Sequence, residues 1–267
     1  MDALDLQPAI EYVNQRGTAV EHARLRYLLH GEAAPADVRE QFLQSQRSDG
    51  GWAPPWAPEY SSLDATCFQL ALADQAGIDR RAPLFIDAVR FLAERQRPTG
   101  EWEEEAAEAA TAPPWAAPGE TDARLYLTAN CGFWVAMTGL VPSAARDAAS
   151  YLSYHVREDG QLPSFLQTHW LAAALWQQRG LVDEATKTLA YLATRLDDLS
   201  AGNLAWLIIA LREGGVPAAD PAVSGALNRL VALRDAAGHW PSDEGIENSV
   251  HVTIEALKSL QLCGRLS

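Results

Sequence analysis

The stretch FLAERQRPTGEW, residues 91–102, closes an amphipathic helical pattern with Pro, Gly and Trp. A version one residue shorter, FLQSQRSDGGW, occupies residues 42–52. Weaker echoes are NQRGT at residues 14–18, VREDGQLP at 156–163, LRDAAGHW at 233–240 and a degenerate TRLDDLS at 194–200. An element that recurs along a chain is typical of a repeat architecture, so similar units build this protein.

Two kinds of helical pattern alternate along the chain. The amphipathic kind spans residues 7–15, 36–46, 83–96, 143–156, 183–196 and 221–233. The other kind is apolar around most of its circumference and ends near Gly31, Gly77, Gly139, Gly180, Gly214 and Gly264. A helix that is apolar on nearly all sides is buried, and a glycine just beyond a helix supplies the left-handed conformation that ends it.

Six pairs of one buried and one amphipathic helix can close into a ring. We therefore predict an all-α fold, an (α/α)6 toroid with apolar helices in an inner ring and amphipathic helices in an outer ring, as a single domain over residues 1–267. Closure removes the exposed ends that an open array must cap. The alternative is an open α-solenoid of the tetratricopeptide type, which the widely varying repeat length disfavours.

The composition narrows the range of partners. The chain has 267 residues, 48% of them hydrophobic, and a formal net charge of -14, which disfavours nucleic acid and anionic membrane surfaces. Three cysteines without a CxxC motif predict no disulfide framework. No apolar run is long enough to span a membrane, and the N-terminal sequence MDALDLQPAIEYV lacks the basic start of a secretory signal, so we expect a cytoplasmic protein.

The Phe-Leu pair, the Gln and the Gly-x-Trp of residues 91–102 resemble the QW motif of squalene–hopene cyclases, oxidosqualene cyclases and related class II terpene cyclases. The resemblance covers essentially the whole chain as repeats and implies the toroid. It also implies that Gln46, Trp52, Gln96 and Trp102 tie one hairpin to the next. A Gln at a helix end can reach unpaired backbone groups of a neighbouring helix, and a Trp adds buried area. Protein prenyltransferases and complement-type thioester domains share this toroid.

One carboxylate lies where this family places its proton donor. The sequence SLDATC, residues 62–67, follows GGW and a Pro- and Trp-bearing loop, and it resembles the family motifs D-x-D-D-T-A and x-x-D-C-T-A. The resemblance aligns Asp64 with the proton-donating Asp, and burial in an apolar lumen would keep such a carboxyl protonated. Ser62 and Ala65 replace two further acids, which favours an epoxide or another activated group as the proton acceptor. The alternative is that Asp64 only caps its helix.

A second lumen residue follows from an internal comparison. Residues 249–253, SVHVT, repeat the pattern of residues 62–66, SLDAT, and this places His251 at the position of Asp64. A His there could hydrogen-bond Asp64, accept a terminal proton or pair with substrate. The alternative is a core His bonded to a backbone carbonyl.

The other expected substrate contacts lie mostly early in the apolar helices. They are Cys67, Phe68, Tyr126, His169, Trp170 and Trp206. An aromatic lumen suits an apolar ligand and the carbocations formed from it, although aromatic residues at helical spacing can also simply fill a core. His22 lies in a first turn, as His169 does, so we expect a polar cluster at one mouth of the barrel. The near-copies APPWAP at residues 53–58 and APPWAAP at 112–118 are candidate flaps over the lumen.

These features predict a class II terpene cyclase-like enzyme, an isomerase or lyase, that starts cyclisation of an isoprenoid polyene by protonation from Asp64. His251 is the second expected catalytic residue, and the sequence implies no metal and no cofactor. The expected partner is a hydrophobic, isoprenoid-like small molecule. Cyclases of this family usually carry a second helical domain, which leaves room for a homodimer or a partner domain.

Three other functions use the same residues. One is a toroid that only binds an isoprenoid or another hydrophobic ligand. Another is a zinc-dependent prenyltransferase-like protein, for which Asp64, Cys67 and His251 supply the right ligand types with one residue too many between Asp and Cys. The third is a glycosidase, whose paired carboxylates would be Asp64 with Asp122 or Glu255.

Overall fold

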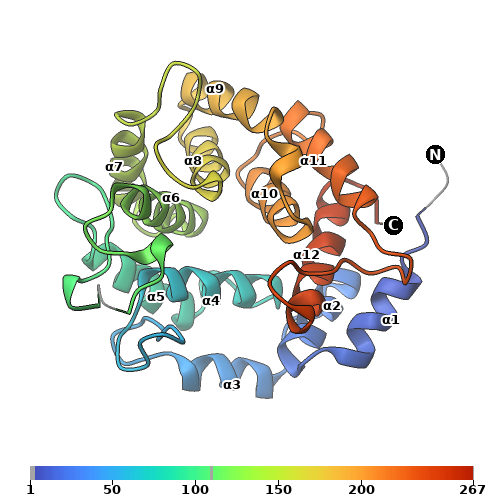
Figure 1. The fold of residues 1–267 in the computed structure, drawn as a ribbon. Coiled ribbons are helices and arrows are strands. Elements are labelled where there is room, and N and C mark those ends of the chain that lie inside the picture. Colours follow the sequence, from blue (N-terminus) through green and yellow to red (C-terminus); the bar gives the residue numbers. More distant parts are fainter. Residues whose placement is uncertain (1–3, 109–110, 267) are drawn as a thin grey trace.

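The structure, a computed structural model, describes residues 4–108 and 111–266, and twelve α-helices form the framework of this part of the chain (Figure 1). The inner helices are α2 (Ala19–His30), α4 (Leu63–Gln75), α6 (Thr121–Thr138), α8 (Leu166–Arg179), α10 (Ala201–Glu213) and α12 (Ser249–Leu262). The outer helices are α1 (Gln7–Arg16), α3 (Ala36–Ser45), α5 (Pro83–Glu94), α7 (Pro142–Ser153), α9 (Val182–Ala193) and α11 (Pro221–Ala232). No strand occurs in the described ranges; Trp52 and Ser62 form an isolated bridge.

The inner helices close into a ring. Each contacts the next around the circle, and α12 contacts α2, so the last hairpin meets the first (Figure 1). This closing contact confirms the predicted α/α toroid and excludes the open solenoid. No helix in the described ranges is long and apolar enough to cross a membrane.

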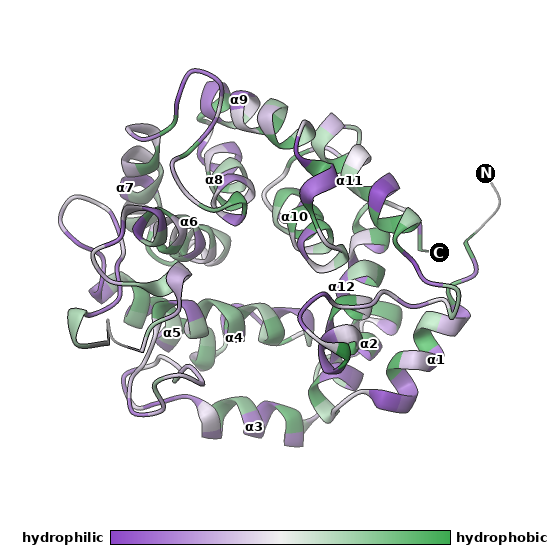
Figure 2. Cartoon of the chain, in the orientation of Figure 1, coloured by the Kyte–Doolittle hydropathy of each residue, from purple (hydrophilic) through white to green (hydrophobic). Residues whose placement is uncertain are grey.

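Burial explains which helices lie inside. In α6 every residue from Leu125 to Val135 is buried, and in α8 every residue from Thr168 to Trp176 is buried. Outer helices such as α9 bury only one face and expose the rest, and Figure 2 shows hydrophilic and hydrophobic residues mixed on them. The all-round apolar pattern and the one-sided pattern therefore mark the two rings as expected.

One of the six glycine ends differs from the sequence prediction. Gly214 does not take the left-handed conformation; its φ is -71°, and the following Gly215 has a φ of 90°. A Cβ on Gly214 would lie 2.6 Å from the Cβ of Ala174 in α8. Gly214 is therefore needed for the close approach of α10 to α8, and Gly215 makes the turn.

Two glutamines connect successive outer helices. The Gln46 side-chain amide donates to the carbonyl of Gly50 at 2.9 Å and to that of Leu84, near the start of α5, at 3.0 Å. In the same way Gln96 donates to the carbonyl of Ala144, near the start of α7, at 2.9 Å. Each amide thus joins the end of one outer helix to the start of the next outer helix, and the adjoining Trp52 and Trp102 are buried.

Candidate active site

A repeated backbone contact aligns three inner helices. The backbone N–H groups of Trp52, Trp102 and Trp240 donate to the hydroxyls of Thr66, Thr128 and Thr253, at 3.1, 3.0 and 3.2 Å. Each hydroxyl donates in turn to the carbonyl four residues earlier in its own helix. The residue two positions before each Thr therefore occupies an equivalent place in the ring. These residues are Asp64, Tyr126 and His251.

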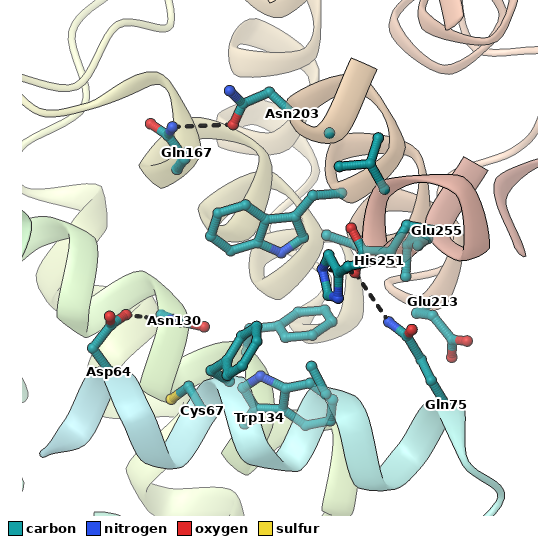
Figure 3. A pocket seen from close by; sticks show the side chains of 18 of the residues that line it. Asp64, Cys67, Gln75, Asn130, Trp134, Gln167, Asn203, Glu213, His251 and Glu255 are labelled. Atoms are coloured by element: carbon teal, nitrogen blue, oxygen red, sulfur yellow. Dashed lines mark hydrogen bonds and ion pairs between the residues drawn. The ribbon is translucent and has the colours of Figure 1, made fainter. Parts of the chain in front are cut away.

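All three residues line a cavity of about 420 Å³ inside the inner ring (Figure 3). This volume lies within the usual range for small-molecule sites. Besides Tyr126, the aromatic side chains in its wall are Phe68, Trp115, Phe133, Trp134, Phe165 and Trp206. The cavity thus combines a cluster of aromatic side chains with polar and charged groups.

The Asp64 carboxylate is bound by three neutral donors. Its Oδ1 accepts hydrogen bonds from the Tyr126 hydroxyl at 2.8 Å and the Asn130 amide at 3.5 Å, and its Oδ2 accepts one from the Trp115 indole at 3.0 Å. Burial raises the pKa of Asp64; these three hydrogen bonds lower it but do not cancel the effect, so the pKa stays above its ordinary value. Trp115 belongs to the second predicted flap, residues 112–118, which therefore reaches the lumen.

Another carboxylate caps the helix that carries Asp64. The Ser62 hydroxyl accepts from the N–H of Ala65 at 3.1 Å, and Glu104 Oε1 accepts from the N–H groups of Leu63 at 2.9 Å and Asp64 at 3.4 Å. Because these groups satisfy the first turn of α4, the Asp64 side chain is not the cap and is free to face the lumen.

Sequence reasoning missed Glu104. It is buried, and its Oε2 accepts a hydrogen bond from the Tyr60 hydroxyl at 2.7 Å. Burial raises the pKa of Glu104, with its hydrogen bonds acting against the shift. It lies in the acidic run of residues 103–105, which resembles a solvated loop, and no local spacing points to a helix start forty residues earlier.

His251 is held by charged neighbours. Arg24 Nη1 lies 2.9 Å from its Nδ1, and Glu255 Oε1 lies 3.3 Å from its Nε2. A guanidinium can only donate, so Nδ1 accepts and the proton of the neutral imidazole lies on Nε2, which donates to Glu255. The predicted hydrogen bond between His251 and Asp64 is therefore wrong, because both ring nitrogens already have other partners. Figure 3 shows Asp64 and the His251–Glu255 pair at separate places around the lumen.

A buried polar network surrounds His251 where the ring closes. Arg24 of α2 is fully buried and donates to the Gln75 amide oxygen of α4, and the Gln75 amide nitrogen donates to Glu255 Oε1 at 3.3 Å. Burial would raise the pKa of Glu255, but His251, the guanidinium of Arg24 and the hydrogen bond from Gln75 lower it to about 2. Glu255 is therefore ionised, in contrast to Asp64.

Ion pairs line the lumen near the opposite ends of the inner helices. Arg80 contacts Asp74 at 2.6 Å and Glu213 at 3.2 Å, and Lys258 contacts Asp74 at 3.6 Å and Glu213 at 3.4 Å. Asp74 is ten residues after Asp64 in α4, or about 15 Å along the helix. The two cations and two anions balance, so these four side chains together carry no net charge.

Not all of the other predicted substrate-contact residues line the lumen. Cys67, Phe68, Tyr126 and Trp206 line the lumen. The Cys67 sulfur lies 3.8 Å from that of Cys131, and both thiols are free. Trp170 does not line the lumen; it is fully buried beside Trp206, with ring centroids 5.5 Å apart.

The two other histidines of the predicted cluster, His22 and His169, lie outside the lumen, which corrects the prediction of a polar cluster at the mouth. His169 Nε2 accepts from the N–H of Leu162 at 3.0 Å, so the ring takes the place of the Thr hydroxyl in the repeated contact. His22 Nε2 lies 3.3 Å from the carbonyl of Val13. The first flap differs from the second as well: its Trp56 packs against Tyr60 and is not part of the lumen wall.

The zinc alternative gains no geometric support. Within the described ranges, no group of three or more His, Cys, Asp or Glu side chains is placed to hold a metal ion. Asp64 and His251, two of the three proposed ligands, use their polar atoms in the separate hydrogen-bond sets described above.

Comparison of the sequence with family models and with curated proteins finds no match. Comparison with solved structures does find similar folds. A protein from Actinoplanes aligns with a TM-score of 0.65 at 15% identity, over 97% of this chain and 98% of that one. The type II terpene cyclase MstE from Scytonema aligns with a TM-score of 0.58 at 17% identity, over 93% and 88%. This chain has the α/α-toroid fold of type II terpene cyclases.

Ligand-bound forms of the Scytonema cyclase are similar too. A variant in complex with geranylgeranyl dihydroxybenzoate, described as its substrate, aligns with a TM-score of 0.55 at 17% identity, over 98% of this chain and all of that one. A variant in complex with merosterolic acid A, described as its product, aligns with a TM-score of 0.59 at 16% identity over the same shares. At these identities the similarity extends to the fold alone.

Proposed function

We propose that this protein is a cyclase that starts ring closure of an isoprenoid polyene by proton transfer from Asp64. The observation that carries the proposal is the setting of this carboxyl group. It faces an aromatic lumen, it does not cap its helix, and its hydrogen-bond donors are the neutral groups of Tyr126, Asn130 and Trp115. A carboxyl kept protonated by an apolar site is a suitable general acid.

The first step transfers the Asp64 proton to the oxygen of a terminal epoxide. The C–O bond then breaks as the π electrons of the neighbouring alkene form a C–C bond, which leaves a carbocation further along the chain. The same three donors remain in place and stabilise the carboxylate that forms, so the site needs no reorganisation at that moment. An epoxide suits a site with one lumen acid of this kind, because an epoxide is more basic than an alkene.

The lumen wall then holds the cation. The faces of Phe68, Phe133, Trp134 and Trp206 can stabilise positive charge while excluding water. The Glu255 carboxylate supplies a fixed negative charge in the same wall. Aromatic faces together with the Glu255 carboxylate therefore favour charged intermediates of an apolar chain over the neutral substrate.

Glu255 is also the proposed acceptor of the last proton. Its contacts with Arg24, Gln75 and His251 all use Oε1, and within the described ranges Oε2 makes no hydrogen bond. The Nδ1 lone pair of His251 is taken by Arg24, so His251 does not accept the proton itself. In this proposal His251 remains part of the site as the residue that orients Glu255.

The test is the Asp64→Asn variant, assayed with the terminal epoxides of farnesol and geranylgeraniol. Losing the general acid should lower kcat by about 10²–10⁴-fold, while substrate affinity and helix content are retained. The matched control is Asp122→Asn, since Asp122 lies near the start of α6 and does not line the lumen. Turnover by Asp64→Asn at the wild-type rate would refute the acid role. Tight binding without product in the wild type would instead favour a binding protein.

A further inference from the structure

A second chamber adjoins the lumen between α2, α3, α4 and the loop before α12. Its volume is about 490 Å³. It shares Phe68, Ser242, Glu244, His251 and Val252 with the lumen wall, so the two spaces meet at these residues. The rings of Phe68 and His251, whose centroids lie 5.8 Å apart, form part of the partition between the two spaces. The Phe68 side chain is 50% exposed, although it belongs to an inner helix, because it stands between the two spaces.

The wall of this chamber combines apolar surface with free amide groups. Phe42 of α3 and Leu72 of α4 provide the apolar part. Gln41 of α3 and Gln69 of α4 provide amides, and neither side chain makes a hydrogen bond to any part of the chain that the structure describes. Each amide can both donate and accept, so together they suit the hydroxyl groups of a ligand.

The charges in the wall exclude an anion. The cation present is Arg24, and its Nε, Nη1 and Nη2 already donate to Gln75 and His251. The carboxylates of Glu21 and Glu244 also line the chamber. A diphosphate or carboxylate placed here would meet two like charges and no free cation, which is unfavourable in a partly buried site.

We propose that this chamber binds the uncharged, hydroxyl-bearing head group of the substrate while the polyene extends past the Phe68 side chain to Asp64. Phe68 follows Asp64 by four residues, one helical turn or about 6 Å along α4, so the two side chains lie on one face of the helix. The head group and the reacting end of the chain thus occupy opposite sides of the Phe68 ring. This inference rests on the proposed function, since it assigns the two ends of the same substrate.

Equilibrium binding of three probes tests this assignment without requiring turnover. The probes are farnesyl hydroquinone, farnesylbenzene and farnesyl diphosphate, measured by isothermal titration calorimetry. We expect the hydroquinone to bind about three- to ten-fold more tightly than the benzene, as one or two neutral hydrogen bonds would give. The diphosphate should bind more weakly than either. A hydroquinone with no advantage, or a diphosphate that binds most tightly, would overturn the proposal.

Amino-acid substitutions test whether the preference for the hydroquinone arises in this chamber. Gln41→Leu combined with Gln69→Leu should remove the advantage of the hydroquinone and leave farnesylbenzene binding unchanged. Gln44→Leu is the matched control, because Gln44 bonds Glu40 on α3 and does not line the chamber. Leu72→Trp, which fills the chamber but not the lumen, should also remove the advantage. A preference that survives both the double variant and Leu72→Trp would contradict the assignment, whereas loss of turnover alone would bear on the acid role of Asp64.

Discussion

Asp64 and His251 occupy equivalent positions in two hairpins but have opposite surroundings. Both lie two residues before a Thr that accepts the backbone N–H of a Trp. Around Asp64 the partners are a phenol, an amide and an indole, all neutral. Around His251 they are the charged groups of Arg24 and Glu255. The repeat thus fixes where a side chain lies, and its neighbours from other hairpins determine its chemistry.

The same contrast separates the carboxyls of Asp64 and Glu255. Burial raises the pKa of Asp64, and its neutral hydrogen-bond donors only reduce that rise. Burial acts in the same direction on Glu255, but His251 and Arg24 lower its pKa to about 2. Asp64 is therefore favoured in its protonated form and Glu255 as a carboxylate. Such a difference in pKa is expected of a general acid and the group that accepts the last proton.

The largest effect on stability should come from removing the cation that pairs with Glu255. Arg24→Met leaves the Glu255 carboxylate buried without its cation, which should cost about 3–5 kcal/mol of unfolding free energy. Urea denaturation monitored by circular dichroism measures this loss. Arg26→Met is the control, since Arg26 is exposed on the same helix. Adding Glu255→Gln to Arg24→Met should restore part of the loss; a double variant no more stable than Arg24→Met would contradict the pairing.

The pH dependence of stability should reveal the ionised Glu255. Its pKa is lowered from 4.5 to about 2 on folding, so its stabilising effect is complete above pH 4.5 and is lost as the pH falls toward 2. The shift corresponds to about 3 kcal/mol. The unfolding free energies of wild type and Glu255→Gln, plotted against pH, should converge as the pH falls from 4.5 toward 2. A difference in unfolding free energy that stays constant with pH would show that the folded state does not stabilise the Glu255 carboxylate.

Removing the Glu104 cap should have a smaller effect. Glu104→Gln keeps one acceptor for the N–H groups of Leu63 and Asp64 but loses the negative charge at the start of α4. The expected cost is about 1 kcal/mol of unfolding free energy, with a modest fall in kcat as the Asp64 backbone loosens. Glu105→Gln, at an exposed neighbouring position, should change neither quantity. Equal effects of the two variants would show that Glu104 does not hold this helix start.

The smallest change is expected in the stability of Asp64→Asn, and its sign is informative. Because the folded pKa of Asp64 is raised, the native state holds this proton more tightly, and stability falls as the pH rises from the ordinary Asp value through the raised one. Asn cannot ionise, so the variant should be slightly more stable than wild type at pH 7. A lower melting temperature for Asp64→Asn would instead indicate a structural role.

Local patterns predicted the framework because they report burial and helix ends. The all-round apolar helices lie inside. The two Pro-rich loops have similar sequences but meet different neighbours. Trp115 reaches Asp64, whereas Trp56 packs on Tyr60. His169 was misassigned because an imidazole nitrogen can accept the same backbone N–H as a Thr hydroxyl, a substitution that spacing alone does not reveal.

The rest of the site depends on closure of the ring. Arg24, Gln75 and Glu255 come from the first, second and last hairpins and meet only when α12 packs against α2. Glu104 reaches α4 from the segment between α5 and α6. Such partners leave no periodic mark in the sequence, so the position of Asp64 could be predicted, whereas the partners of His251 and the cap of α4 could not.

The protonation of Asp64 is the central claim, and carboxyl ¹³C NMR tests it most directly. In protein labelled at the Asp side-chain carbons, the resonance missing from the Asp64→Asn spectrum belongs to Asp64. We predict that this resonance titrates with a midpoint above the ordinary Asp value of 3.8. A midpoint at or below 3.8 would mean that the hydrogen bonds from Tyr126, Trp115 and Asn130 outweigh burial, and would contradict the role of Asp64 as the acid that starts cyclisation.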